Sequence, residues 1–246
     1  MTPRAPQTLV VIPTYNESEN LPRIIPIVLG QDPTVDVLVV DDASPDGTGA
    51  VADDLAAHSP GRVHVLHREG KAGLGPAYLA GFRWALQRGY LRVCQMDADL
   101  SHPPQMLPEM IRKVSRDDVD FVVGSRYMEG RVTVVNWPMG RLLISYFGNA
   151  YARFVTGLPI SDVTGGFNIY DNKVLSSLPL NDIQSTGYTF QIELKLRAWK
   201  RGFRFAEVPI VFTERDQGES KMSKRIVFEA VWKVWTLRAL DILGRL

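Results

Sequence analysis

The first half of the chain alternates short apolar segments with longer segments of helical character, and this alternation restricts the fold more than any other feature. Segments rich in Val, Leu and Ile cover residues 8–12, 35–40, 62–66, 91–96 and 120–123. Short apolar runs predict strands, and strands without a polar face are typical of a parallel sheet with helices on both sides. We therefore predict an α/β fold with a Rossmann-like, mostly parallel sheet flanked by helices.

Helices are predicted between these strands and again in the second half. In the first half we expect them at residues 19–29, in a segment ending near residue 57, and at residues 76–88 and 106–114. In the second half we expect helices at residues 138–157 and 189–200, an edge strand within residues 161–170, a strand at residues 203–208 and a charged loop at residues 213–221.

Polar side chains follow every predicted strand of the first half at the point where the strand ends. These clusters are residues 13–17, Asp41 with Asp42, residues 67–71, Asp97 with Asp99, and residues 124–126. In an open parallel sheet, ligands bind in the crevice outside the carboxyl ends of the strands. Solubilising charges would be spread over both edges of the sheet, so this pattern predicts one binding site at one edge.

Asp97 and Asp99 end the fourth predicted strand and are separated by one residue. Side chains alternate along a strand, so both carboxylates project to the same side. Two like charges that close are costly unless a cation lies between them. Carboxylate oxygens suit Mg²⁺ or Mn²⁺, above all where the metal also holds a diphosphate. Taken alone, the pair could equally be two solvated turn residues.

The charge balance and the single cysteine exclude several classes of protein. Lys and Arg total 28 and Asp and Glu total 27, which argues against nucleic-acid binding. Cys94 lies in an apolar segment, is expected to be buried, and has no cysteine in the chain to pair with, which fits a reducing compartment. Residues 1–8 lack the character of a signal peptide, and no run of about 18 apolar residues predicts a membrane span.

Two phosphate-binding motifs are absent from the sequence. No Gly-x-x-x-x-Gly-Lys-Ser/Thr motif occurs, although a Gly73-Leu74-Gly75 loop is present. No Gly-x-Gly-x-x-Gly motif follows the first strand, which disfavours a dinucleotide cofactor. Kinase and dehydrogenase functions are therefore disfavoured, and a transferase that uses a nucleotide sugar remains.

Two segments of the second half suit contact with a membrane or a partner. Between residues 138 and 157, an apolar stripe and a polar row occupy different faces of one predicted helix. The stripe is Leu143, Phe147, Ala150 and Phe154, and the row is Arg141, Ser145 and Asn149. Residues 224–246 combine Trp and Val with basic residues, as in an amphipathic helix at a membrane interface, although core packing would also fit.

Several motifs together resemble the inverting GT-A glycosyltransferases, and more narrowly the dolichol-phosphate (polyprenol-phosphate) mannose synthases. They are Pro-Thr-Tyr-Asn-Glu at 13–17, Val-Asp-Asp-Ala-Ser-Pro-Asp-Gly-Thr at 40–48, Lys-Ala-Gly-Leu-Gly at 71–75, Asp-Ala-Asp-Leu-Ser-His-Pro at 97–103 and Gly-Ser-Arg-Tyr at 124–127. Residues 136–138, 162–167 and 214–221 support the narrower match. The resemblance extends from about residue 8 to residue 224.

The resemblance implies metal-dependent transfer of mannose from GDP-mannose to polyprenyl (dolichyl) phosphate, with inversion at the anomeric carbon. It implies a catalytic domain at residues 1–224 and an amphipathic helix at residues 225–246. The protein would then act in the cytoplasm, peripherally at the cytoplasmic face of a membrane. It would meet its lipid through surface helices or through a separate membrane anchor protein.

The resemblance also assigns roles to individual residues. The residues implied to bind the nucleotide sugar are Pro13, Tyr15, Glu17, Val40, Asp42, Lys71, Asp97, Ala98, Asp99, Arg215 and Lys221. Those implied to act in catalysis are Asp97, Asp99 and Arg126, and those implied to bind the acceptor phosphate are Arg126, Arg141 and Ser145. Asp99 would bind Mg²⁺ or Mn²⁺ directly, with Asp97 and Ser101 as further ligands, and some relatives carry Gln in place of Ser101.

Two other functions remain open at this point, and a third is disfavoured by a missing motif. The same fold could use UDP-glucose or another nucleotide sugar with a polyprenyl phosphate acceptor. A scaffold without activity could bind only a nucleotide or a partner. A processive polysaccharide synthase would carry Gln-x-x-Arg-Trp, and the nearest segment here, Leu196-Arg197-Ala198-Trp199, lacks that motif.

Overall fold

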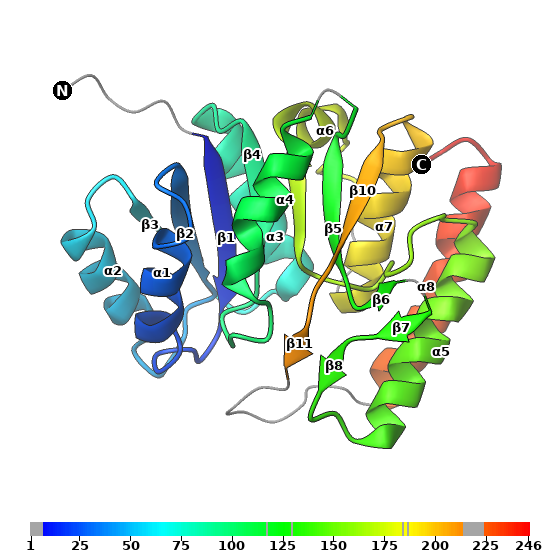
Figure 1. Ribbon diagram of the computed structural model, residues 1–246, viewed down its shortest axis with the longest axis horizontal. Coiled ribbons are helices and arrows are strands. Elements are labelled where there is room, and N and C mark those ends of the chain that lie inside the picture. Colours follow the sequence, from blue (N-terminus) through cyan, green and yellow to red (C-terminus); the bar gives the residue numbers. More distant parts are fainter. Residues whose placement is uncertain (1–6, 117, 129, 184, 186, 214–223) are drawn as a thin grey trace.

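A seven-stranded sheet in the order β10-β5-β9-β4-β1-β2-β3 forms the centre of the computed structural model (Figure 1). The structure describes residues 7–116, 118–128, 130–183, 185, 187–213 and 224–246, and the side chains of 224–230 are not described. The strands are β1 (Thr8–Thr14), β2 (Val35–Asp41), β3 (Val63–His67), β4 (Arg92–Gln95), β5 (Phe121–Ser125), β9 (Asn168–Asp171) and β10 (Phe205–Pro209). All neighbours pair in parallel except β9, so the α/β prediction is confirmed.

The prediction of an edge strand within residues 161–170 is wrong. The strand there is β9, which lies inside the sheet between β4 and β5 and runs antiparallel to both. Its residues Asn168, Ile169 and Tyr170 are fully buried. The amide of Asn168 is accommodated inside the protein because its Nδ2 donates to Gln95 Oε1 at 3.0 Å. β10 occupies that edge instead.

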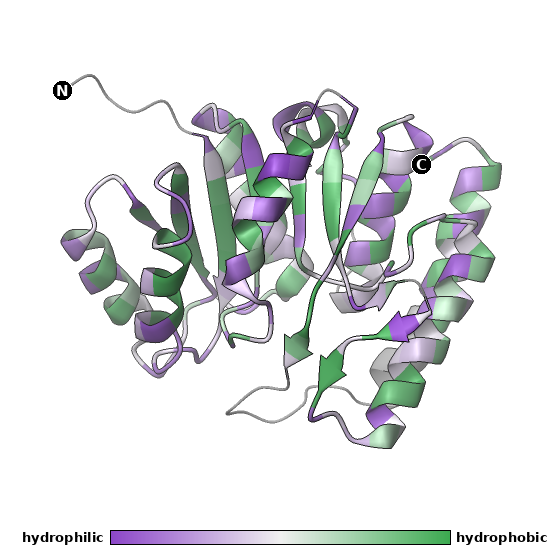
Figure 2. Cartoon of the chain, in the orientation of Figure 1, coloured by the Kyte–Doolittle hydropathy of each residue, from purple (hydrophilic) through white to green (hydrophobic). Residues whose placement is uncertain are grey.

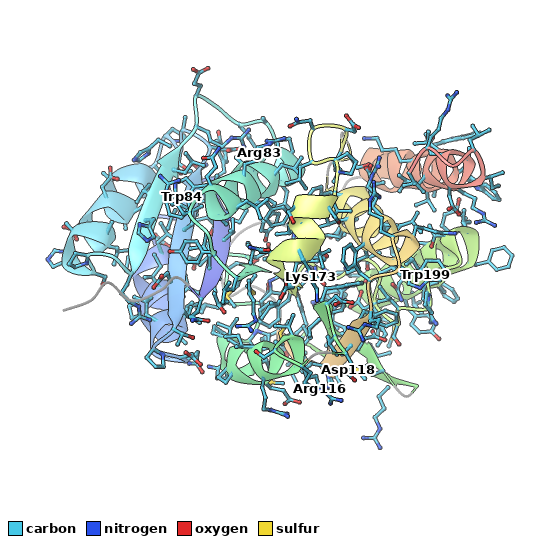
Figure 3. All side chains as sticks on the ribbon, turned by 90° about the horizontal axis from the view of Figure 1, so that it is seen from above. Arg83, Trp84, Arg116, Asp118, Lys173 and Trp199 are labelled. Atoms are coloured by element: carbon cyan, nitrogen blue, oxygen red, sulfur yellow. The ribbon has the colours of Figure 1, made fainter. Side chains whose placement is uncertain are left out.

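Helices cover both faces of the sheet. They are α1 (Leu21–Leu29), α2 (Thr48–His58), α3 (Leu74–Gln87), α4 (Leu107–Val114) after a 3-10 turn (Pro104–Met106), α5 (Met139–Thr156), α6 (Asn172–Ser177), α7 (Gly187–Lys200) and α8 (Lys224–Ile242). One apolar core joins α1, α2 and α4 to one face, and another joins α3, α6 and α7 to the other. In the view from above, Arg83 and Trp84 of α3 lie on one side of the sheet and Arg116 and Asp118 on the other (Figure 3).

Short strands and two long helices extend the sheet edge at which the parallel strands end. β6 (Tyr127–Met128) pairs with β7 (Arg131–Val132), and β8 (Val134–Val135) pairs with β11 (Phe212–Thr213). These short pairs lie below the main sheet, beside α5 and α8 (Figure 1). α5 and α8 lie against one another, and the Tyr151 hydroxyl donates to the Val231 carbonyl at 3.2 Å.

The apolar stripe expected on residues 138–157 is helical and faces outward. Phe147 and Phe154 of α5 are 64% and 86% exposed, and Trp232 of α8 is 70% exposed. Apolar turns of α5 are visible in Figure 2. Within the described residues, no helix combines the length and the apolar character that crossing a bilayer requires.

Candidate functional site

The carboxyl ends of the parallel strands open on a pocket with a volume of about 470 Å³. The ends of β1, β2 and β4 contribute Pro13, Asp42 and Asp97, and the opposite wall comes from α5, α7 and α8. Figure 1 shows the elements that contribute its lining, from the ends of β1 and β2 to α5. The pocket therefore lies at the sheet edge that the polar clusters of the sequence predict.

At one end of the pocket, the loop after β3 is fixed against the end of β2. Asp42 accepts from Arg68 Nη1 at 2.6 Å and from the backbone N–H of Ala72 at 3.1 Å. Next to this loop, Lys71 Nζ lies 3.8 Å from the ring centroid of Tyr15. An aromatic ring and a cation at the mouth of a pocket suit a flat base and a phosphate.

Non-glycine residues with positive φ follow three strand ends at the pocket. They are Asn16 (φ 61°) after β1, Ala43 (φ 52°) after β2 and Leu100 (φ 61°) after β4. A left-handed conformation costs an L-residue other than Asn or Asp about 1–2 kcal/mol. Such strain is found where tertiary contacts impose it, commonly at functional sites. After Leu100, the chain turns so that Ser101 reaches back to Asp99.

Asp97 and Asp99 both line the pocket, and each carboxylate is oriented by a neighbour. Asp97 Oδ1 accepts from the buried Tyr78 hydroxyl at 3.3 Å. Asp99 Oδ1 accepts from Ser101 N at 3.1 Å and from Ser101 Oγ at 2.6 Å. The Ser101 hydroxyl is thus directed at the carboxylate of Asp99.

The acid pair fits a divalent cation that is shared with a diphosphate. No group of three or more His, Cys, Asp and Glu residues able to hold a metal is found among the described residues. Mg²⁺ commonly binds through one or two carboxylates together with substrate phosphates and water. Asp97 and Asp99 supply this donor set, so the residues present fit the implied metal.

His102 lies behind the acid pair and is neutral with a defined tautomer. Its Nδ1 accepts the backbone N–H of Asp97 at 3.0 Å, so the proton of the neutral ring is on Nε2. Burial lowers the pKa of His102, and the nearby Asp97 and Asp99 offset this only in part. The ring stacks on Phe167, with centroids 5.3 Å apart.

Arg126 follows β5 and forms a buried ion pair with Asp162. Its Nε and Nη2 donate to the two carboxylate oxygens of Asp162 at 2.7 and 2.8 Å, and its backbone N–H donates to Asp162 at 3.1 Å. Nη2 also donates to Thr164 Oγ1 at 3.0 Å. Arg126 lines the pocket, and within the described chain no hydrogen bond uses its Nη1.

Lys195 of α7 holds the segment that follows Asp162. Its Nζ donates to the carbonyls of Val163 at 3.2 Å and Gly165 at 2.6 Å, and its side chain is fully buried. Burial lowers the pKa of Lys195, and the charge of Asp162 only partly opposes this, so the pKa falls to about 7.

The depressed pKa of Lys195 predicts a dependence of stability on pH. An unfolded lysine has a pKa of about 10.4, so between about pH 7 and 10 the unfolded chain binds a proton that the folded chain lacks. Stability therefore rises with pH across this window. We expect Lys195→Met to remove a rise on the order of a few kcal/mol, measured by urea unfolding at pH 6.5 and 9.5. The same rise in both proteins would contradict the assignment.

The polar row of α5 reaches the other end of the pocket. Arg141 and Ser145 line it, and Ser145 Oγ lies 2.8 Å from the Tyr127 hydroxyl. The guanidinium carbon of Arg141 lies 4.3 Å from the ring centroid of Trp137, and that of Arg126 lies 5.8 Å from the same ring. Two arginines therefore approach one indole at this end.

The structure brings most of the predicted site residues to this one pocket. Those that line it are Pro13, Tyr15, Asp42, Lys71, Asp97, Ala98, Asp99, Arg126, Arg141 and Ser145. Glu17, Val40 and Ser101 are not among its lining residues. Glu17 accepts from Asn20 Nδ2 at 2.7 Å, and Val40 is buried in β2. Arg215 and Lys221 lie outside the described residues.

Sequence reasoning assigned no role to several residues that shape the pocket. His102 and Asp162 stood inside motifs that supported the resemblance, but the partner of each is visible only in the structure. Asn149 stood in the polar row of α5, and it holds the segment before Thr164 by bonds to Ser161 O and Val163 N. Gln191 and Lys195 lie on α7, where no sequence signal separates them from surface residues.

Comparison with known proteins gives matches over most of the chain. Residues 9–178 match the model of glycosyl transferase family 2. A polyprenol monophosphomannose synthase of Mycolicibacterium smegmatis is 52% identical over 234 residues, covering 94% of this chain and 88% of that protein. An undecaprenyl-phosphate mannosyltransferase of Micrococcus luteus is 49% identical over 235 residues, covering 95% of each chain.

Solved structures with low sequence identity share the fold. One is glucosyl-3-phosphoglycerate synthase from Mycobacterium tuberculosis in complex with Mn²⁺, UDP and glucosyl-3-phosphoglycerate. It has a TM-score of 0.68 and 19% identity, with 97% of this chain and 80% of that chain covered. Another structure of the M. tuberculosis synthase has a TM-score of 0.65 and 21% identity. The predicted GT-A fold is thereby confirmed.

Proposed function

Because the chain belongs to glycosyl transferase family 2, we propose that it transfers mannose from GDP-mannose to a polyprenyl phosphate. The observation that carries this proposal is a single pocket with an acid pair near one end and two arginines at the other. The names of two relatives at about half identity, a polyprenol monophosphomannose synthase and an undecaprenyl-phosphate mannosyltransferase, support the sugar and the acceptor class.

The donor nucleotide would bind at the end of the pocket formed by β1, β2 and the loop after β3. Tyr15 would stack on the base, Asp42 would accept from the ribose hydroxyls, and Lys71 would face a phosphate. Asp97 and Asp99 would hold Mg²⁺ or Mn²⁺ together with the diphosphate. A divalent cation bound there would offset the negative charge that grows on the departing GDP.

The acceptor would bind at the arginine end. Arg126, whose orientation Asp162 fixes, and Arg141, which lies over Trp137, present planar donors that suit a phosphate. A lipid phosphate is already ionised at neutral pH, so its oxygen attacks without a strong general base. The chain's contribution is therefore to position two phosphates on opposite sides of one sugar. In-line attack would then invert the anomeric carbon.

The proposed reaction is tested by product analysis with each donor in turn. Purified protein would be incubated with undecaprenyl phosphate, Mg²⁺ and radiolabelled GDP-mannose, UDP-glucose or UDP-N-acetylglucosamine. We expect labelled lipid from GDP-mannose alone. Label transferred only from a UDP-sugar would refute GDP-mannose as the donor. Absence of transfer from every donor would favour a scaffold without activity that binds only a nucleotide or a partner.

We further propose that the outer side of α5 and α8 rests on a lipid surface, where a polyprenyl phosphate would be found. Phe147, Phe154 and Trp232 are exposed there, on the two helices that also contribute Arg141, Ser145 and Val231 to the wall of the pocket. Burying a phenylalanine that would otherwise contact water contributes about 1.5–3 kcal/mol. A surface helix that carries such side chains binds at the interface without spanning it.

Replacing Phe147 and Phe154 with serine should therefore reduce vesicle binding by at least about tenfold. Flotation with phosphatidylglycerol vesicles measures the bound fraction. Leu91→Ser is the matched control, because Leu91 is 44% exposed and precedes β4 at the opposite edge of the sheet. Wild-type protein that stays unbound would instead point to a separate membrane anchor protein.

A further inference from the structure

The amide of Gln191 carries a buried donor without a protein partner. Gln191 lies on α7, is 2% exposed and lines the pocket. Its Oε1 accepts from Asn168 Nδ2 at 3.3 Å, whereas its Nε2 has no hydrogen-bond partner among the described residues. Turning the amide over would set two NH₂ groups against each other, so this orientation is the favourable one.

The orientation of Asn168 is itself fixed by the backbone. Asn168 Nδ2 donates to the carbonyl of Gly165 at 3.1 Å and to Gln95 Oε1 at 3.0 Å. A backbone carbonyl only accepts, so the nitrogen of Asn168 must face it. The Gly165 carbonyl therefore orients the Asn168 amide, and the Asn168 amide in turn orients the Gln191 amide so that its Nε2 faces away from Asn168.

His102 supplies a second donor beside it. Its Nδ1 is occupied by the Asp97 N–H, which leaves Nε2–H to donate, and within the described chain no hydrogen bond uses that atom. His102 also lines the pocket. The stack on Phe167 and the edge contact with Phe212 hold the ring in place.

Both donors meet in front of Gly166, whose missing side chain leaves room there. A Cβ on Gly166 would lie 3.6 Å from Gln191 Nε2 and 3.8 Å from His102 Nε2. The two nitrogens are neutral, and both face the same small part of the pocket. Neutral paired donors suit hydroxyl oxygens, whereas a phosphate is better served by the cations nearby.

The proposed function places the transferred sugar at this position. His102 accepts from the backbone N–H of Asp97 at the acid pair, and Gly166 lies two residues after Thr164, whose hydroxyl accepts from Arg126. The sugar has to lie between the donor diphosphate and the acceptor phosphate, because its anomeric carbon exchanges one for the other. We propose that Gln191 Nε2 and His102 Nε2 donate hydrogen bonds to hydroxyl oxygens of the hexose, a contact that rests on the proposed function.

The contact would select the sugar rather than the nucleotide. A site built to donate to substrate hydroxyls rejects a ligand that lacks them, because its buried donors then remain unpaired. The measured quantity is the ratio of affinities for GDP-mannose and GDP, determined by calorimetry with Mg²⁺ present. In Gln191→Leu we expect this ratio to fall by roughly 10- to 100-fold, while the affinity for GDP changes by less than about threefold.

Two further variants separate this contact from a structural role. Gly166→Ala places a methyl group in front of both donors at ordinary contact distances, and Gly166 has no positive φ, so we expect the same loss of ratio in a folded protein. Gln95→Leu removes the bond from Asn168 to Gln95, but the Gly165 carbonyl still orients Asn168 and Gln95 does not line the pocket, so the ratio should equal that of the wild type.

Two results would overturn the proposal of this contact. One is an equal weakening of GDP and GDP-mannose by Gln191→Leu and Gly166→Ala, which would assign the donors to the phosphates. The other is a Gln95→Leu ratio that falls as far as that of Gln191→Leu. The wild-type transfer assay tests separately whether mannose is transferred. If another sugar nucleotide is the donor, the ratio of the affinities for that sugar nucleotide and for its nucleoside diphosphate still tests the hydroxyl contact.

Discussion

Replacing Asp99 with asparagine is expected to reduce sugar transfer by about 10³-fold or more while the protein stays folded. Asparagine keeps the shape of the side chain and an oxygen that can accept from Ser101, so the turn after β4 should persist. It removes the negative charge with which the acid pair would hold a divalent cation against the diphosphate. The loss should therefore fall on turnover and not on folding.

Initial rates at saturating GDP-mannose and lipid phosphate measure this effect, and circular dichroism confirms the fold. Asp118→Asn is the matched control, because Asp118 is an exposed acid that pairs with Arg116 and precedes β5 at the opposite edge of the sheet (Figure 3). Its turnover should equal that of the wild type. Near-normal turnover of Asp99→Asn in excess Mg²⁺ would argue strongly against a role for this carboxylate.

Replacing Asp162 with alanine is expected to lower the free energy of unfolding by about 3–5 kcal/mol, because it leaves the guanidinium of Arg126 buried without its anion. Arg126 is 6% exposed and Asp162 is fully buried. Arg116 and Asp118 form an equally bidentate pair that is about 60% exposed. Asp118→Ala should therefore cost less than about 1 kcal/mol. Equal losses in urea unfolding of the two variants would contradict this account.

The ion pair also makes the free energy of unfolding depend on pH in the acidic range. Burial raises the pKa of Asp162, but the charge and hydrogen bonds of Arg126 outweigh burial and lower the pKa to about 2. An unfolded aspartate has a pKa of about 3.9, so the folded chain holds fewer protons between these values. The stabilisation is complete above about pH 4 and is lost as the pH falls through about 2. The free energy of unfolding of Asp162→Ala should lack this dependence on pH.

The sequence predicted the parallel strands and the pocket at their ends because both depend on local patterns. Runs of apolar residues mark β1, β2 and β4, and the polar residues directly after them, such as Asp42 and Asp97, can only lie at one edge. The position of Arg126 followed from the same rule.

The remaining features depend on contacts between distant segments. The partner of Arg126 is Asp162, 36 residues further along the chain, and the partner of Gln95 is Asn168, 73 residues away. No periodicity records such pairs. The inner position of β9 could not be predicted for the same reason, because it depends on pairing with β4 and β5, which lie far away in the sequence.

The reversed direction of β9 determines how the site can come apart. A reversed strand begins where its parallel neighbours end, so the segment that enters it, with Asp162 and Gly166, lies at the carboxyl edge. Fraying of β9 would thus separate the two halves of the sheet and release the counter-ion of Arg126 in the same event. Amide protons of Ile169 and Tyr170 should exchange with solvent only in molecules that have also lost the ion pair between Arg126 and Asp162.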